Sequence, residues 1–224
     1  MSALAAVLTL ADARLPTGGH AHSGGVEQAI LDGFVTDTGS LADFLDRRLH
    51  TAGPVAAAFA AAACHAVEST DRLADLDAEA DARTPSPALR SASRALGRGL
   101  TRLGRRAWPH PAWDALPDSP HHSIALGVAA AAAGLDPASA AHVAAYLAIS
   151  GPATAAQRLL SLDPLIVATI TAGLCTAIDA VADRAARDHA EPGSALYAMC
   201  ALSDPWFDLL AETHASRKDR LFAS

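Results

Sequence analysis

Residues Pro164 to Val181 read PLIVATITAGLCTAIDAV. Large apolar side chains recur in this stretch at every third or fourth position, at Ile166, Ile170, Leu174, Ile178 and Val181. That spacing places them on one face of an α-helix. We therefore predict a central core helix, the longest of the helical segments, that ends at the Pro-Gly pair of residues 192–193.

Aspartate–proline pairs indicate further helix starts. An aspartate side chain can cap the first turn, and proline fits the first helical position because no backbone N–H is needed there. The chain has this pair at residues 136–137, 163–164 and 204–205, and Pro54 lies just inside a fourth apolar segment. The pattern predicts four helix starts.

The segment after residue 39 resembles a capping box, because Ser40 is followed by Asp43 three positions later. The helix that it opens is predicted to stop near Gly53. Strand signals are nearly absent, since few segments alternate polar and apolar residues and β-branched residues rarely cluster. The predicted fold class is all-α: a single compact, bundle-like domain of roughly eight to ten helices over residues 1–224.

Two regions are predicted to be irregular. Residues 17–25 contain four glycines and two histidines, which is typical of a loop, and a helix is expected to open at Ser23. Residues 108–120 form a proline-rich loop. Between them, residues 84–87 (Thr-Pro-Ser-Pro) are expected to break the helix between an acidic segment, 68–81, and a basic one, 83–106.

Composition narrows the possible functions. The 224 residues are 51% hydrophobic but only 4% aromatic, so helices are expected to pack closely through alanine. A net charge of -7 argues against nucleic-acid binding. No run approaches the length of a membrane span, and the N-terminus lacks a signal-peptide pattern. The three distant cysteines fit a reducing compartment, so we expect a cytoplasmic protein.

Motifs for catalysis are missing from the sequence. The single lysine, Lys218, lies near the C-terminus, so a Walker A loop cannot form. Ala21 stands two residues before Ser23, where a nucleophile elbow needs glycine. H-E-x-x-H, C-x-x-C and a strand-borne G-x-G-x-x-G are also absent. We predict that the protein is not an enzyme and has no catalytic residues.

Histidines occur in two metal-like spacings, His20 with His22 and His121 with His122. Neighbouring neutral imidazoles can share an ion, but neither pair has a thiolate or carboxylate close to it in sequence. We predict that these histidines hydrogen-bond backbone groups and form no dedicated metal site. Transient passage of a metal across them stays open.

A basic stripe is formed by Arg90, Arg94, Arg98 and Arg102, which are four residues apart, and Arg105 and Arg106 extend it. On a helix this spacing places the guanidinium groups on one slowly turning face. The stripe is either a solvated surface or a docking surface for carboxylates, which the planar fork of arginine suits. RNA binding is less favoured, because no aromatic residue interleaves before Trp108.

The C-terminal segment, residues 205–224, is predicted to be a helix and tail with an apolar end at Leu221 and Phe222. Such an end is unfavourable in water. It either packs back on the domain or docks on another protein, and the sequence favours neither.

The N-terminal pattern resembles the signature of the urease accessory protein F family, UreF. The matching residues are Leu8-x-Leu10-Ala11-Asp12-x-x-Leu15-Pro16-Thr17-Gly18-Gly19-x-Ala21-His22-Ser23-x-Gly25-x-Glu27. Further segments match in order along the chain: Gly33-Phe34-Val35-Thr36, Ser40-Leu41, Phe44-Leu45, Ser93-Arg94, Gly97-Arg98-Gly99, Ala155–Leu160, His214 and Arg220-Leu221-Phe222-x-Ser224. The alanine bias and the prolines near residue 85 are most similar to the actinobacterial branch.

The resemblance implies an all-helical chaperone that is often a homodimer and that joins UreD and the GTPase UreG on apo-urease. In such an assembly GTP hydrolysis accompanies delivery of nickel to the urease active site. The UreF-like member couples the GTPase to urease and performs no chemistry, so nickel and GTP are handled by the complex and no cofactor is expected in this chain. No nucleic acid or membrane is expected as a partner.

By matched position, the resemblance also implies partner-binding residues. Glu27 and Arg158 correspond to a charged pair that communicates with the GTPase, and the stretch before Glu27 is expected to be a rigid entry into a helix that presents Glu27 to a partner. The tail residues expected to dock on a partner are His214, Arg220, Leu221 and Phe222. No metal ligand is expected.

The chain departs from the family pattern at His20, Gly24, Ala215 and residues 161–164, where Ser-Leu-Asp-Pro replaces Pro-x-Gly-Gln. The backbone of that turn is expected to differ. Two other functions stay open: a helical interaction regulator without a nickel connection, and a metalloenzyme built from the histidines at positions 20, 22, 121 and 122.

Overall fold

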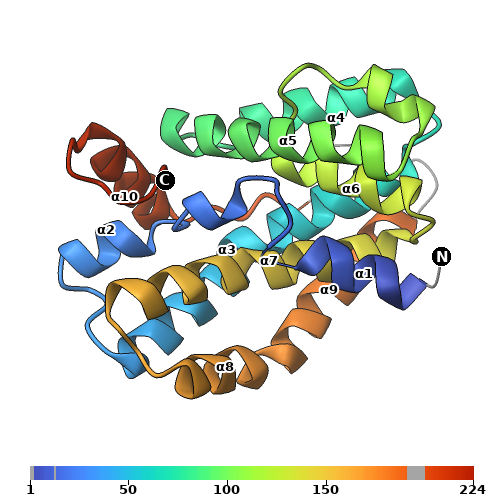
Figure 1. The fold of residues 1–224 in the computed structure, drawn as a ribbon. Coiled ribbons are helices and arrows are strands. Elements are labelled where there is room, and N and C mark those ends of the chain that lie inside the picture. Colours follow the sequence, from blue (N-terminus) through green and yellow to red (C-terminus); the bar gives the residue numbers. More distant parts are fainter. Residues whose placement is uncertain (1–2, 13, 191–199) are drawn as a thin grey trace.

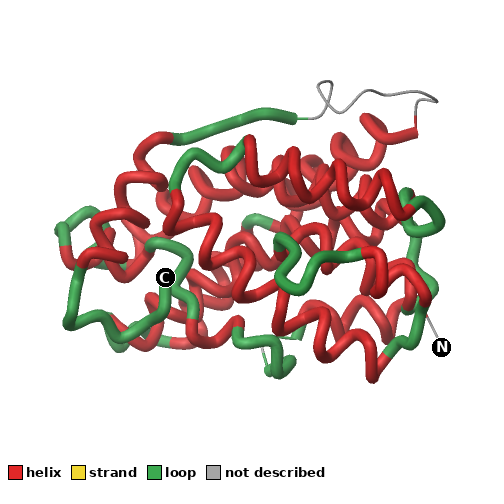
Figure 2. The backbone as a smooth tube through the Cα atoms, turned by 90° about the horizontal axis from the view of Figure 1, so that it is seen from above, coloured by secondary structure: helices red, strands yellow, loops and turns green. Residues whose placement is uncertain are grey.

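Helices make up all the regular secondary structure that can be described. The computed structural model describes residues 3–12, 14–190 and 200–224, with the side chains of residues 188–190 left out. Within these ranges there are ten α-helices, two 3₁₀ helices and no strand. The backbone trace in Figure 2 accordingly alternates between helices and loops. The elements are α1 (Ala3–Ala11), η1 (Gly19–Ala21), α2 (Val26–Leu31), α3 (Thr38–His65), α4 (Thr70–Ala82), α5 (Pro87–Ala107), η2 (Pro111–Ala115), α6 (His122–Ala132), α7 (Pro137–Leu159), α8 (Pro164–Gly173), α9 (Cys175–Ala190) and α10 (Pro205–Ser216). The all-α prediction is confirmed.

The centre of the molecule is the packed pair α3 and α7, with α6 and α9 against it and α4 and α5 farther out (Figure 1). Every residue from Ala57 to Ala63 in α3 is buried. In α6, a Cβ added to Gly127 would collide with the carbonyl oxygen of Ala60. Small side chains therefore let these helices approach closely, as the composition predicts.

The predicted boundaries of α3 are wrong at both ends. The N-cap is Asp37, whose Oδ1 accepts the Ser40 N–H at 2.8 Å, while Ser40 Oγ accepts the Asp37 N–H at 3.1 Å. The capping box therefore begins three residues earlier than predicted, with Ser40 at its third position. The helix also continues through Gly53 and Pro54, so the helix start predicted at Pro54 is wrong as well. Packing on several sides offsets the hydrogen bond that proline cannot donate.

The three aspartate–proline helix starts are confirmed. Each aspartate side chain accepts a backbone N–H of the first turn: Asp136 from Ser139, Asp163 from Leu165, and Asp204 from Trp206. The break at residues 84–87 is also confirmed, since α4 ends at Ala82 and α5 begins at Pro87. Sequence rules for caps thus identify these boundaries correctly.

The predicted helix after Pro164 is two helices. α8 and α9 meet at Leu174 with a bend of 42°. In α8 only Val167 is buried and Leu165 is 77% exposed, whereas α9 buries Ile178 and Val181 in the core. The bend follows Gly173, a residue with low helix propensity, and leaves α8 along the lower edge of Figure 1. The predicted end at residues 192–193 lies outside the described residues.

One loop differs from its prediction, and one turn departs from the family pattern as predicted. α2 begins at Val26 and not at Ser23, with Gly25 as its N-cap at φ 91°, a left-handed conformation that glycine adopts without strain. In the turn after α7, Ser161 has φ 52°. Proline is fixed near −65°, so this turn cannot have the backbone of a sequence with proline there, as expected from the departure at this position.

No single described helix is both long and apolar enough to cross a bilayer; α8 and α9 would reach that length only as a bent pair. The three cysteines are free. Cys64 is buried, Cys200 is half-buried and Cys175 is exposed.

Candidate functional site

The C-terminal tail returns to the loop before α2, so residues nearly 200 positions apart lie together (Figure 1). The Ala223 N–H donates to the carbonyl oxygen of Ala21 at 2.7 Å, and the Ser23 N–H donates to the carbonyl oxygen of Ser224. The His22 Nδ1 and Ser224 Oγ atoms are 2.6 Å apart. These contacts fix the last residues of the chain against the Thr17–Gly25 loop.

The Glu27 side chain binds the tail through hydrogen bonds. Its side chain is buried, with the residue 3% exposed. The carboxylate accepts the backbone N–H of Leu221 at 2.7 Å and that of Phe222 at 3.1 Å. It also accepts a hydrogen bond from Nε2 of His214, in α10, at 2.6 Å. A buried carboxylate is stable when several donors satisfy it, and here three donors do so.

His214 is almost fully enclosed, with the residue 1% exposed. Its Nε2 faces Glu27, and its Nδ1 has no hydrogen-bond partner among the described residues. The Glu27 carboxylate therefore determines how this imidazole is oriented. The same carboxylate thus joins α2, α10 and the tail.

Arg158 completes the arrangement from the last turn of α7. Its guanidinium carbon lies 5.4 Å from the centroid of the buried Phe222 ring, a cation–π geometry. Leu221, next to that ring, is 79% exposed. The two apolar tail residues therefore face opposite ways, one into the fold and one into solvent. We call Glu27, Arg158, His214, Leu221 and Phe222 the tail lock.

Five of the six predicted partner-binding residues therefore converge in one place. The sixth, Arg220, is exposed and reaches only the carbonyl oxygen of Ala215, at 3.5 Å. Glu27 is buried under the tail, so this structure does not present its carboxylate directly to a partner. A protein that approaches this face meets Leu221, Arg158 and Arg220. Partner binding by these residues stays a prediction.

Sequence reasoning missed the main-chain contacts between residues 21–23 and 223–224, because backbone pairing leaves no residue-type signature. The apolar end of the tail is the one indication in the sequence. It predicts that the tail either packs on the domain or docks on another protein. In this structure the tail packs on the domain, and Phe222 is buried.

The four histidines of the possible metal site do not form one. His121 is buried and hydrogen-bonded to Ser93 and Asp81, at 3.0 and 3.1 Å. Burial, with a smaller contribution from His22, lowers the pKa of His122 to about 4. His20 is exposed. Among the described residues, no three or more histidine, cysteine, aspartate or glutamate side chains are arranged to hold a metal ion.

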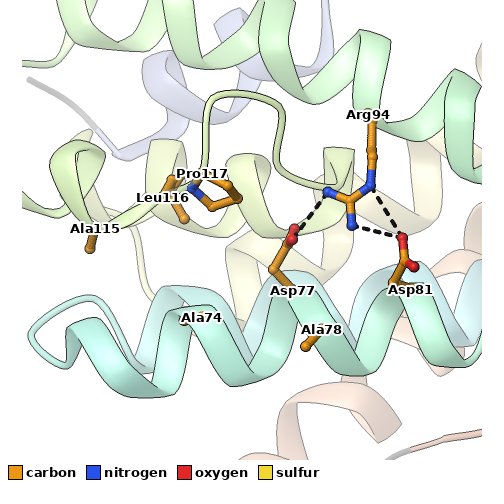
Figure 3. Close-up of a pocket in the computed structure, with 8 residues that line it drawn as sticks. All are labelled: Ala74, Asp77, Ala78, Asp81, Arg94, Ala115, Leu116 and Pro117. Carbon is orange, nitrogen blue, oxygen red and sulfur yellow. Dashed lines mark hydrogen bonds and ion pairs between the residues drawn. The ribbon is translucent and has the colours of Figure 1, made fainter.

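A surface cavity of about 640 Å³ lies between α4 and the loop at residues 115–117 (Figure 3). Arg94 closes one side of it and donates to Asp81 at 2.7 Å and to Asp77 at 3.1 Å. Asp77 in turn accepts the backbone N–H of His121. Because the charged groups at this cavity are bound to each other, the network serves to join α4, α5 and the start of α6.

Comparison with known proteins gives a consistent result. A sequence model of the UreF family matches residues 35–175. The chain is 49% identical to the urease accessory protein UreF of Mycolicibacterium vanbaalenii and 50% identical to that of Mycobacterium sp. strain JLS. It is 45% identical to the urease accessory protein UreF of Mycobacterium tuberculosis H37Rv. In each case the alignment covers 100% of both chains. The predicted similarity to actinobacterial members is confirmed.

Proposed function

The chain belongs to the UreF family of urease accessory proteins, and on that basis we propose that it is a non-catalytic scaffold for nickel incorporation into urease. Family membership supports a role in urease maturation, and the relatives are named as accessory proteins and not as enzymes. In this proposal the chain joins UreD and the GTPase UreG on apo-urease in the cytoplasm. Nickel and GTP are held by other members of the assembly, so this chain carries no cofactor.

The tail lock is the observation that carries this proposal. Glu27 and His214 are buried and hydrogen-bonded at 2.6 Å, and the Glu27 carboxylate also binds the backbone N–H of Leu221, a residue that is 79% exposed. A buried polar network with satisfied partners favours one arrangement of the groups around it. Here the fixed groups are the exposed Leu221 and the guanidinium of Arg158. We propose that UreD or UreG binds this ordered surface. In this proposal Glu27 does not contact the partner and acts by holding the tail in place.

Two experiments test the proposal. The first expresses the cognate urease with UreD and UreG, with and without this chain, and measures nickel-dependent urease activity and nickel content. Full activity without the chain would rule out the scaffold role. The second truncates the chain after Ser216, which removes the tail but leaves α10. Assembly should weaken more than thermal stability, and loss of the fold instead would show that the tail is only structural.

We also propose that the chain is a homodimer through α8. Between Asp163 and Asp179 the sequence has no charged residue, although Leu165 and Ile166 are exposed. At a two-fold axis each residue lies near its own copy, so like charges would repel there and an uncharged, self-complementary face is favoured. A stable interface needs about 800 Å² per partner, so we propose that the uncharged start of α9 takes part in it with α8.

Leu165→Glu should convert a dimer to a monomer in sedimentation analysis without lowering the melting temperature, because the side chain already faces solvent. Leu8→Glu is the matched control, since Leu8 is 63% exposed on α1. A monomeric wild-type protein, or dimers in both variants, would contradict the assignment.

A further inference from the structure

The arginines of α5 fall into two groups with different surroundings. Arg94 is bound to Asp77 and Asp81 on α4 (Figure 3). Arg90 donates to the carbonyl oxygens of Thr84, at 2.6 Å, and Pro85. The first half of the predicted basic stripe is therefore neither a free docking surface nor a solvated face. Its guanidinium groups connect α5 to α4 and to the turn that precedes it.

The second half of the helix is different. Arg98, Arg102 and Arg106 are exposed, and none of them has a carboxylate partner within the described part of the chain. The nearest polar contact of Arg98 is the Ser119 hydroxyl, at 3.4 Å. The spacing of four residues places the three guanidinium groups on one face. We call these three residues the arginine face.

Arg105 lies beside this face, but its positive charge is paired with a carboxylate. Its guanidinium group donates to Asp114 at 2.6 Å and to the Trp113 carbonyl oxygen at 2.7 Å. Like charges one helical turn apart repel each other, so three adjacent uncompensated arginines weaken the helix slightly. The chain has 24 acidic residues, yet none lies between Pro87 and Ala107. The positive charge is therefore concentrated on an otherwise acidic protein.

Close packing holds the arginine face rigid. A Cβ added to Gly97 would collide with the carbonyl group of Pro120, and one added to Gly99 with the carbonyl group of Thr17. A Cβ at Gly104 would collide with the Trp113 ring. These three glycines let α5 lie directly on three other segments. Because the backbone of α5 is already fixed, only the arginine side chains lose conformational freedom on binding.

We propose that Arg98, Arg102 and Arg106 form a docking face for an acidic protein surface that presents carboxylates about one helical turn apart. The inference rests on the proposed function, so the partner is a component of the urease maturation assembly. Arginine binds a carboxylate through two parallel hydrogen bonds, which gives directional contacts on such a surface. The net charge of -7 and the lack of aromatic residues among these arginines favour a protein over a nucleic acid.

The test uses the full-length chain with Arg102→Glu and Arg106→Glu together. The matched control is Arg184→Glu with Arg187→Glu, two exposed arginines on α9 that give the same change in charge. Each protein is titrated separately with purified cognate UreD, UreG and apo-urease by biolayer interferometry at low and at high ionic strength. For one of these components, the affinity of the first variant at low ionic strength should be lower than that of wild type by a factor of about ten or more. The affinity of the control variant should equal that of wild type. High ionic strength should reduce the difference.

A second variant keeps the test independent of folding. Arg102→Lys with Arg106→Lys preserves the charge but not the planar fork, so its affinity should lie between those of wild type and the glutamate variant. Circular dichroism verifies that each protein is helical. If the glutamate variant is misfolded, Arg102→Gln with Arg106→Gln replaces it.

Equal affinities of the glutamate variant and its control for all three components would overturn the inference. So would a difference in affinity between them that ionic strength does not alter. Loss of duplex RNA binding as the only effect of the substitutions would also overturn it. The scaffold proposal fails separately, if urease is fully activated without the chain. Should activation need the chain but not the arginine face, the inference alone is wrong.

Discussion

Replacement of Glu27 by alanine should release the C-terminal tail while the rest of the fold remains intact. The expected effect follows from comparing the entropic cost of ordering the tail with the free energy of the contacts that the tail makes. Ordering the last four residues costs about 1–2 kcal/mol each in conformational entropy. Burial of the Phe222 side chain returns about 2 kcal/mol. The two hydrogen bonds that the Leu221 and Phe222 amides donate to the Glu27 carboxylate return about 1.5–3 kcal/mol each, and the two backbone hydrogen bonds between the tail and residues 21 and 23 return about 1 kcal/mol each.

These terms leave the docked tail favoured by about 2 kcal/mol, an equilibrium ratio of about 30. Without the carboxylate, ordering costs more than burial of the Phe222 ring and the two remaining backbone hydrogen bonds return, so the undocked tail is favoured. Loss of docking contributes about 2 kcal/mol to the loss of global stability, and the buried His214 imidazole, left without its partner, adds to it. The melting temperature should therefore fall by at least about 4–8 °C in a chain of this length.

Amide hydrogen exchange measures the release directly. The amides of Leu221 and Phe222 should exchange about 30-fold faster in Glu27→Ala than in wild type, whereas amides in the centre of α3 should change little. Glu68→Ala, which removes an exposed carboxylate, is the control and should leave the tail protected. Unchanged protection of the two tail amides in Glu27→Ala would refute the account of the tail lock.

Three other substitutions test the fold. Gly99→Ala should destabilise the protein by about 1–3 kcal/mol in urea unfolding, because its Cβ meets the Thr17 backbone, whereas Gly151→Ala, with open space around it, should be neutral or slightly stabilising. Asp37→Ala should cost about 1 kcal/mol through loss of the α3 cap; an unchanged urea midpoint would contradict this. Burial lowers the pKa of His122 from 6.5 to about 4, so the unfolded chain binds more protons between these values and stability should fall as the pH drops through them. His122→Asn should flatten that dependence, by at most about 3 kcal/mol, and a pH profile like that of wild type would contradict it.

The sequence predicts local features of the fold well and their tertiary context less well. Aspartate caps at positions 136, 163 and 204 are correctly predicted, because a cap depends on residues within one turn. The continuation of α3 through Pro54 is not predictable from local rules, since distant packing offsets the missing hydrogen bond. The division of the helix after Pro164 at Leu174 is missed for a related reason. Apolar periodicity indicates which residues share a face, but not whether that face is covered.

The candidate site shows a similar limit. The resemblance selects Glu27, Arg158 and His214 by position, and the structure brings them together at the tail. It cannot indicate that the Glu27 carboxylate faces inward, because burial depends on residues nearly 200 positions away. Likewise, the regular spacing of arginines on α5 does not show which of them bind carboxylates of α4 and which have no carboxylate partner among the described residues. Only the position of Asp77 and Asp81 makes that distinction.

The contact between Glu27 and Leu221 joins residues 194 positions apart. During synthesis Leu221 leaves the ribosome long after Glu27, so this contact forms later than the contacts among the helices between them. A chain released early retains the N-terminal half of the arrangement but cannot close it. If the closed tail is what other proteins recognise, chains that stop before Leu221 are excluded from assembly without a separate proofreading step.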